Sequence, residues 1–278
     1  MTNLIFAICS SAAISLIMRL SSDKIQNNLS LLAVNYLTCL ALSAVFSSAD
    51  SFFPRDPGLM PTLGMGIFNG FLYLAAFVTF QRSVHRNGVV LSAIFMKLGL
   101  LVPMVVSIFL FGEIPGPAQI MGFCLAVTAI ILINFEKDTA ASASALGLLI
   151  LLLLGGSADA MSKVFEELGP GDLSSQFLLY TFGTALLLCL GLVLWNKQRF
   201  TRWELIYGLA VGIPNFFSAR FLLGALESLP AVIVYPTYSV ATILLITLAG
   251  TLCFREKLRK RQWAALGIIL LALVLLNL

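Results

Sequence analysis

The sequence has few charged residues and few groups that bind metals or act as catalysts. Only 11% of its 278 residues are charged, and His85 is the single histidine; a soluble domain carries about 25% charged residues. Its five cysteines show no CxxC or Cys/His spacing, so neither structural zinc nor disulfides are expected. It has no Walker loop, HExxH or GxSxG motif, which argues against a nucleotide-driven pump or a hydrolase. We therefore expect that the protein is not an enzyme and that it has no catalytic residue, no bound metal and no cofactor.

The chain consists mostly of long apolar runs. It is 59% hydrophobic with a mean hydropathy of +0.99, and its runs of about twenty residues match the thickness of a bilayer. Backbone groups in lipid must be satisfied internally, so these runs predict helices. We expect an all-α membrane protein with ten transmembrane helices, at 3–20, 29–48, 60–81, 88–111, 117–135, 145–165, 174–195, 204–226, 230–253 and 262–278. The first run has no basic flank or cleavage site and is expected to be a retained helix.

A polar marker after the fourth apolar run recurs 143 residues later. Its positions in the first and second copies are Phe111 and Phe254, Glu113 and Glu256, Gln119 and Gln262, and Asn134 and Asn277. Apolar helices share Leu and Ala by chance, but less easily Glu, Gln and Asn, so the marker indicates a duplication. We expect halves at 1–136 and 145–278, joined by a linker at 137–144. Five helices per half make the repeat inverted, as in secondary transporters. Glu113 and Glu256 are expected to cap the next helix, with a role in transport as the alternative.

The basic residues indicate the orientation of the chain. Thirteen of the seventeen lie in one alternating set of loops, whereas Arg55 is alone in the other set. The positive-inside rule places the first set in the cytoplasm and both termini outside. We therefore assign the net charge of +4 to topology and expect no nucleic-acid partner.

The duplicated marker resembles that of the drug/metabolite transporter superfamily in its ten-helix, EamA-like form. Members carry Gly-Glu, then Gln, before a last hydrophobic helix in each repeat; Gly112-Glu113 and Gln119 match this pattern, while the second copy has Arg255 where glycine is usual. The resemblance covers the whole chain. It implies that helices one to four and six to nine surround a central cavity, with helices five and ten at the periphery.

Charged residues inside the predicted spans are candidates for a substrate site. A charge at a span centre costs about 2.5–3.5 kcal/mol, so it usually faces a cavity and has a partner. Lys97, Asp159 and Arg220 fit this description, and Asp159 is the candidate for proton coupling. The alternative is a buried structural ion pair of Asp159 with Lys163 or Lys97. Lys163 is alternatively a residue that snorkels to the membrane interface.

Polar and aromatic residues on single helix faces extend the candidate substrate site. Tyr235, Tyr238 and Ser239 share a face of the ninth run, with Tyr235 alternatively an interfacial belt residue. Asn69 and Tyr73 share a face of the third run, and Asn215 follows Pro214 in the eighth.

These residues predict a secondary transporter of the plasma or inner membrane that works by alternating access. It would export a small polar or amphipathic metabolite, amino-acid-like or drug-like, with proton coupling, as a monomer or weak homodimer. The presence of both charge signs favours a zwitterion. The alternatives are an uncoupled uniporter, an exchanger or an importer, and a membrane-embedded enzyme or partner subunit.

Overall fold

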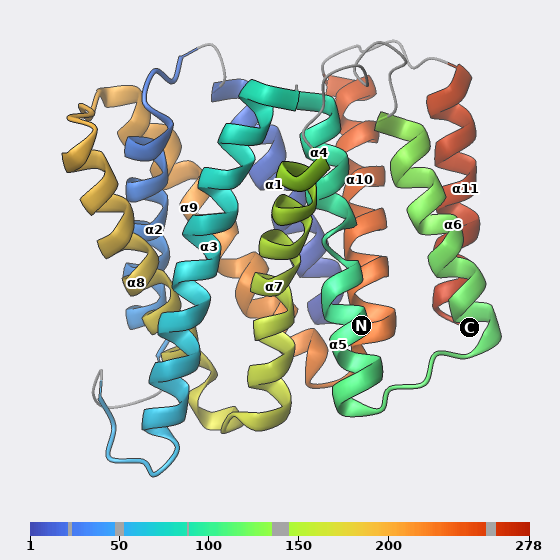
Figure 1. The fold of residues 1–278 in the computed structure, drawn as a ribbon, viewed down its shortest axis with the longest axis horizontal. Helices are drawn as coiled ribbons and strands as arrows, with labels where there is room; N and C mark the ends of the chain where they lie inside the picture. The colour runs from blue at the N-terminus through green and yellow to red at the C-terminus, as the bar shows by residue number, and fades with distance from the viewer. Residues whose placement is uncertain (22–23, 48–52, 88, 135–144, 254–259) are drawn as a thin grey trace. The chain divides into compact units, whose positions relative to one another are not determined.

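The computed structural model describes residues 1–21, 24–47, 53–87, 89–134, 145–253 and 260–278. Every regular element within these ranges is a helix (Figure 1). The helices are α1 (Thr2–Ser21), α2 (Asn28–Val45), α3 (Leu59–Asn87), α4 (Val89–Leu98), α5 (Leu101–Phe111), α6 (Pro117–Asn134), α7 (Ala145–Leu168), the 3₁₀ helix η2 (Gly171–Leu173), α8 (Ser174–Trp195), α9 (Arg202–Leu226), α10 (Ala231–Cys253) and α11 (Lys260–Leu276). The expected linker at 137–144 and the second marker residue Glu256 lie outside the described residues.

Seven of the described helices are long and apolar enough to cross a membrane. They are α1, α2, α3, α7, α8, α9 and α10, and three shorter apolar stretches lie at Phe95–Phe111, Pro117–Leu132 and Trp263–Leu276. This composition makes the chain a multi-pass membrane protein. The expected count of ten spanning helices stays a prediction.

The apolar run at 88–111 was expected to be one helix, and this expectation is wrong. The run is divided at Gly99 and Leu100 into α4 and α5. Pro103 has no backbone N–H, so the carbonyl of Gly99 lacks its normal helical partner. The N–H of Val102 bonds that carbonyl instead, at 2.9 Å, in a tighter turn.

The described helices form two compact units. The first unit contains Met1–Leu74 and Val164–Glu227, and the second contains Ala75–Lys163 and Ser228–Leu278. Each unit therefore draws helices from both parts of the sequence, and α3 and α7 contribute to both units. The boundaries of the sequence repeats, 1–136 and 145–278, stay a prediction.

In the first unit, α9 packs against α1 and α2, and α2 packs against α8. The close contact of α9 with α2 depends on two glycines one turn apart. A Cβ atom at Gly208 would lie 2.5 Å from Cβ of Val34, and one at Gly212 would lie 2.5 Å from Cβ of Thr38. Small residues at such positions let helix backbones approach one another in a membrane.

Gly212→Ala is expected to lower the free energy of unfolding by about 1–3 kcal/mol, because the added methyl group overpacks the α2–α9 contact. Gly191→Ala is the matched control: Gly191 lies in α8, and a Cβ atom there would meet nothing within 4 Å. The control should be neutral or stabilising, since alanine favours a helix over glycine. Thermal unfolding of the purified variants in detergent measures both, and equal melting temperatures for the two variants would contradict the prediction.

A buried carboxylate holds together one end of the first unit. Glu204 lies in the first turn of α9, is 0% exposed, and forms a capping box with Thr201. Its Oε1 also accepts hydrogen bonds from the backbone N–H groups of Gln26 and Asn27, at 3.0 and 3.1 Å. One side chain thus satisfies the amides at the start of α9 and those before α2.

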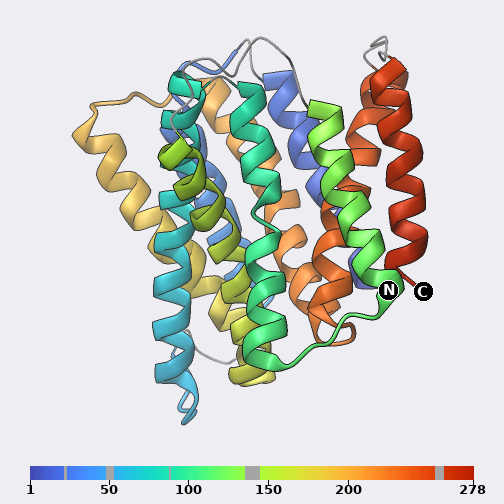
Figure 2. The same cartoon turned by 45° about the vertical axis from the view of Figure 1, so that its right-hand side comes forward.

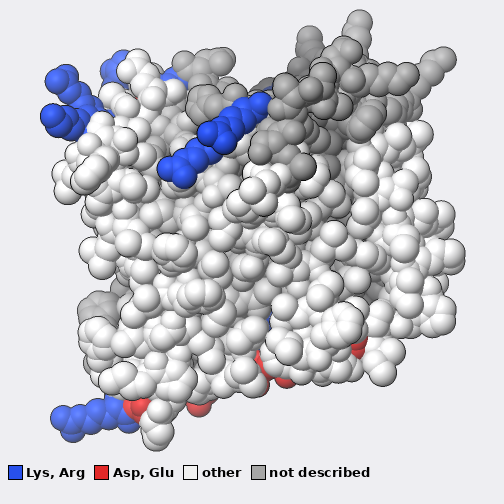
Figure 3. Space-filling view, viewed as in Figure 1, with Lys and Arg blue, Asp and Glu red and all other residues white. Residues whose placement is uncertain are grey.

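The two ends of the first unit differ in charge. The basic end, where α1 and α8 end and α2 and α9 begin, carries Arg19, Lys24, Lys197, Arg199 and Arg202. The opposite end, which we call the acidic end, carries Asp56, Glu166, Glu167, Asp172 and Glu227 together with Arg55. At the left of Figure 3, over α2 and α8, basic atoms are seen above, and acidic atoms with further basic atoms are seen below.

In the second unit, α6 packs along α11, and both contact α10. The α6 and α11 ribbons run side by side in both views (Figures 1 and 2). Gly122 permits this contact, because a Cβ atom there would lie 2.9 Å from the backbone N of Leu276. The buried core of these helices contains Leu100, Ala126, Ala129, Ile130, Val240, Ile243, Leu266, Ile269 and Ala272.

Candidate functional site

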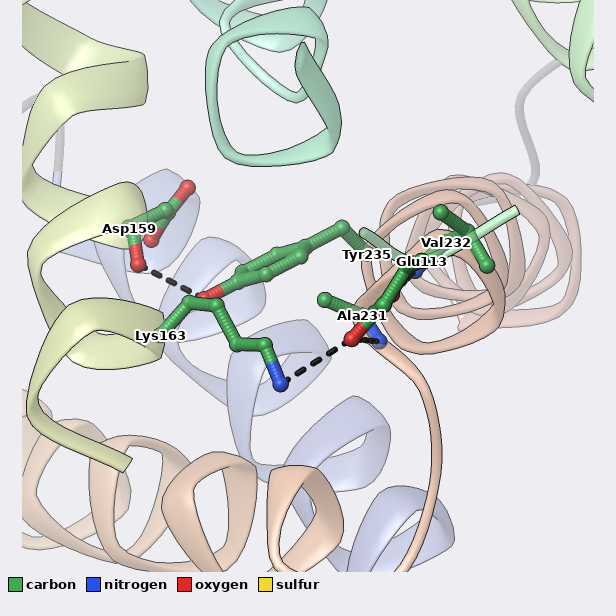
Figure 4. Close-up of polar contacts among 6 residues, drawn as sticks. All are labelled: Glu113, Asp159, Lys163, Ala231, Val232 and Tyr235. Carbon is green, nitrogen blue, oxygen red and sulfur yellow. Dashed lines mark hydrogen bonds and ion pairs between the residues drawn. The ribbon is translucent and has the colours of Figure 1, made fainter. Parts of the chain in front are cut away.

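The candidate site in the second unit is built around Glu113, which follows α5 (Figure 4). The helix ends at Gly112, whose φ of 69° lies in the left-handed region that favours glycine. The N–H of Glu113 then bonds the carbonyl of Ser107 at 3.1 Å. This helix end turns the chain and directs the Glu113 side chain toward α10.

The carboxylate of Glu113 caps α10. Its two oxygens accept hydrogen bonds from the backbone N–H groups of Ala231 and Val232, each at 3.0 Å. These amides have no partners within the helix, and the positive end of the helix dipole favours an anion there. The expected capping role is present, but the capped helix is α10. It is not the next helix, α6, because the chain crosses to α10 before α6 begins.

Lys163 of α7 completes this cluster. Its Nζ lies 3.0 Å from Oε1 of Glu113, and the side chains of Lys163 and Glu113 are 3% and 13% exposed. Nζ also lies 5.9 Å from the ring centroid of Phe111. The expectation that Lys163 snorkels to the interface is therefore wrong, whereas its pairing with Asp159 stays a prediction beside the ion pair with Glu113. We call Glu113, Lys163, Ala231 and Val232 the Glu113 cluster.

Asp159 lies one turn before Lys163 on α7, and its backbone carbonyl accepts a hydrogen bond from the hydroxyl of Tyr235 at 2.6 Å (Figure 4). Tyr235 comes from α10 and is 1% exposed. This burial excludes the alternative of an interfacial belt residue. Together with the Glu113 cluster, the tyrosine connects α7 to α10 at two neighbouring turns.

Lys97 in the last turn of α4 and Asp159 are partly buried, and their opposite charges attract one another. The glycines of α7 allow α4 to lie close to α7, since a Cβ atom at Gly155 would lie 2.8 Å from Sδ of Met96. A Cβ atom at Gly156 would lie 2.7 Å from Cβ of Val102. The break between α4 and α5 therefore lies against the part of α7 that precedes Asp159.

Hydroxyl groups add polarity to α10 and α5. Tyr238 and Ser239 lie on the same α10 face as Tyr235, and Ser239 is 9% exposed. Ser107 of α5 and Thr242 of α10 are 0% exposed, and their hydroxyl groups have no hydrogen-bond partner among the described residues. Sequence reasoning missed Ser107 because a lone serine in an apolar run gives no signal of which face is buried.

The remaining predicted site residues lie in the first unit. Asn215 of α9 donates its side-chain N–H to Oδ1 of Asn35 at 3.1 Å. Asn69 of α3 is 1% exposed, and its Oδ1 has no partner in the described part of the chain. Tyr73 packs edge-on against Phe182.

Arg220 donates from Nη1 to the carbonyl of Phe46 at 3.3 Å. The structure thus groups Lys97, Asp159, Tyr235, Tyr238 and Ser239 in one unit and Asn69, Tyr73, Asn215 and Arg220 in the other. Asn35 was missed as a partner of Asn215, since the two residues are 180 positions apart. The described residues also contain no group of three or more His, Cys, Asp or Glu side chains that could hold a metal ion.

Comparison with known proteins identifies the family of the chain. A model of the EamA-like transporter family matches residues 2–135 and again residues 142–278. An uncharacterized protein of Haemophilus influenzae is 24% identical over 282 residues, which cover 97% of this chain and 94% of that protein. A crystal structure of another protein matches with a TM-score of 0.78 at 15% identity, covering 100% of this chain and 98% of that one, and so shares its fold. The chain belongs to the EamA-like transporter family and is a multi-pass membrane transporter of the drug/metabolite type.

Proposed function

We propose that this chain is a secondary active transporter of the cell membrane, which exports a small zwitterionic metabolite by alternating access and exchanges it for protons. The observation that carries the proposal is the pair of opposite charges, Lys97 and Asp159, beside the break between α4 and α5. Charges within a span are costly and usually functional. Broken helices recur at the substrate sites of secondary transporters.

The two charges give a scheme for exchange. The Lys97 ammonium holds the carboxylate of the substrate, and the ionised Asp159 carboxylate holds the substrate ammonium. A proton on Asp159 removes the charge that the substrate ammonium needs. Substrate and proton therefore compete for Asp159, which is the requirement for exchange of one against the other. Tyr238 and Ser239, on the adjoining face of α10, supply hydrogen bonds and packing.

The Glu113 cluster holds in place two of the helices that carry this site. It fixes the N-terminal turn of α10 and the Lys163 turn of α7, one turn beyond Asp159. Its charges are already satisfied by one another and by the helix amides. We therefore assign the Glu113 cluster to positioning, and Lys97 and Asp159 to the substrate and the proton.

The charge distribution of the first unit supports an orientation with its basic end in the cytoplasm. The acidic end and both termini then face outside. The predicted ten spans, five in each half of an inverted repeat, would bring the C-terminus back to the side on which the chain begins.

Asp159→Asn is expected to abolish the response of transport to a pH gradient, because the amide does not take up a proton. A thermal-shift screen of metabolites on the purified protein first identifies a ligand, since a ligand that binds only the folded state raises the melting temperature. Flux of that ligand is then measured in proteoliposomes with and without an imposed pH gradient. The wild type should respond to the gradient. The variant should show no response and should also bind the ligand more weakly, because its amide lacks the charge that the substrate ammonium needs.

Asp172→Asn is the matched control, since Asp172 is exposed on η2 and should leave the gradient response intact. Lys97→Met should weaken binding of the ligand. Flux that ignores the gradient in the wild type, with Asp159→Asn fully active, would remove proton coupling and identify an uncoupled uniporter or exchanger.

A further inference from the structure

A polar pocket of about 210 Å³ lies at the acidic end of the first unit. Its lining includes Asn3, Ser174, Ser175, Arg220, Phe221 and Glu227. Pockets for drug-sized ligands usually enclose about 300–1,000 Å³, so this pocket suits a smaller molecule. Hydroxyl, amide and both kinds of charged group line it, together with apolar carbon from Phe221.

The guanidinium of Arg220 is held at this pocket by the end of α2. It donates to the carbonyl of Phe46 at 3.3 Å and lies 5.4 Å from the Phe46 ring centroid. The hydroxyl of Ser175 donates to the same carbonyl at 3.4 Å. Carbonyls at a helix C-terminus attract a cation. Arginine has five N–H donors in a planar fork, so the contact with Phe46 leaves donors for a carboxylate.

Glu227 places an opposite charge on the same side of α9. It follows Arg220 by seven residues, which is two helical turns on one face and about 10.5 Å along the helix axis. Within the described residues, Arg220 and Glu227 form no ion pair with each other or with another side chain. The pocket therefore presents a cation and an anion that are separated and not neutralised by direct contact.

The edge of the pocket adds a neutral polar group. The side-chain amide of Asn3 in α1 donates to the carbonyl of Gly224 at 2.9 Å. A Cβ atom at Gly224 would lie 2.7 Å from Nδ2 of Asn3, so glycine is what allows this approach. Asn3 is thereby fixed between the two charged residues of α9.

We propose that this pocket binds a small zwitterion, whose carboxylate pairs with Arg220 and whose ammonium pairs with Glu227. The inference rests on the proposed function, because it takes the transported metabolite as the ligand of the pocket. It adds a second binding site for that metabolite, separate in its residues from Lys97 and Asp159. The side chain of Phe221 packs against the carbon skeleton of the ligand.

Calorimetric titration of the purified full chain tests this site with two zwitterions, L-leucine and L-alanyl-L-leucine, and two analogues with a single charge. L-Leucinamide lacks the carboxylate and should bind about ten- to a hundredfold more weakly than L-leucine, the usual range for a lost charge-assisted hydrogen bond. N-Acetyl-L-leucine lacks the ammonium and should bind about two- to fivefold more weakly, since Glu227 is exposed.

Variants then assign each charge of the ligand to its residue. Arg220→Gln should weaken binding of L-leucine by the larger factor, and Arg220→Lys should restore part of it. Arg202→Gln removes an arginine from the other end of α9 and should bind like the wild type. Glu227→Gln should weaken binding of L-leucine but leave N-acetyl-L-leucine unchanged, because that analogue lacks the group that Glu227 recognises.

The outcomes separate this site from the transport site. If Arg220→Gln loses binding at the pocket and Lys97→Met loses a separate binding event at the transport site, both sites are supported. An effect of Arg220→Gln without one of Lys97→Met supports the pocket and removes Lys97 from the transport site. Equal binding by Arg220→Gln and the wild type, or no binding of either zwitterion, overturns the pocket.

Discussion

Replacing Glu113 with alanine is expected to lower the free energy of unfolding by about 3–5 kcal/mol, the range for a buried ion pair that loses one partner. The change leaves the Lys163 ammonium in a site where its side chain is 3% exposed. It also removes the acceptor from the N–H groups of Ala231 and Val232. Unfolding of the purified variant in detergent, followed by circular dichroism, measures the loss.

The partner variant should be milder. Lys163→Met removes the cation but leaves the Glu113 carboxylate bonded to two amides at the start of α10, where the helix dipole stabilises an anion. The unbranched side chain of methionine fills most of the volume of lysine. The loss in Glu113→Ala should therefore exceed that in Lys163→Met, and their double-mutant cycle should show coupling. Asp172→Asn serves as the control for removal of an exposed acid. Additive effects of the two variants would show that the ion pair contributes nothing.

Glu204→Ala is expected to lower the free energy of unfolding by about 2–4 kcal/mol, from several unsatisfied donors and a lost helix cap. Glu204 accepts from the N–H groups of Gln26, Asn27 and Thr201 and from the Thr201 hydroxyl. Hydrogen exchange should therefore accelerate at the amides of Gln26 and Asn27. Mass spectrometry of the peptide that contains these residues measures this directly.

Substitutions at Thr201 distinguish the contribution of the α9 cap from that of the hydrogen bonds between Glu204 and the residues before α2. Thr201→Ser keeps the hydroxyl and should resemble the wild type. Thr201→Ala should cost only about 1 kcal/mol, the usual value of one cap, and leave exchange at Gln26 and Asn27 slow. Fast exchange at these two amides in Thr201→Ala as well would show that the side chain of Glu204 does not hold them by itself.

The family of this chain follows from its sequence, and the family comparison confirms it. The marker around Glu113 gave this result because a polar triplet at fixed spacing is rare in apolar helices. The limits of several helices were also well predicted. The run at 174–195 coincides with α8, and that at 230–253 differs from α10 by one residue. Apolar runs bounded by Gly, Pro and charge leave little freedom in where a helix begins and ends.

The partners of the charged residues were not predictable in the same way. Lys163 lies one turn from Asp159 in the sequence, so helical spacing favoured their pairing. The structure pairs it with Glu113, fifty positions away, because the Glu113 side chain at the end of α5 contacts both α7 and α10. The break of the helix at Gly99 was also missed, because the sequence pattern did not indicate it. Pro103 lies in a strongly apolar run, and hydropathy carries no information on where a helix is interrupted.

The sequence by itself determined that this chain is a duplicated, helical membrane transporter, because membrane insertion depends on the length of apolar runs and on the few charges between them. The tertiary structure decided which charges meet. It assigned Glu113 to the start of α10, Lys163 to Glu113, and Arg220 to the end of α2. Such contacts join residues far apart in the chain, and their geometry is fixed only when the helices pack.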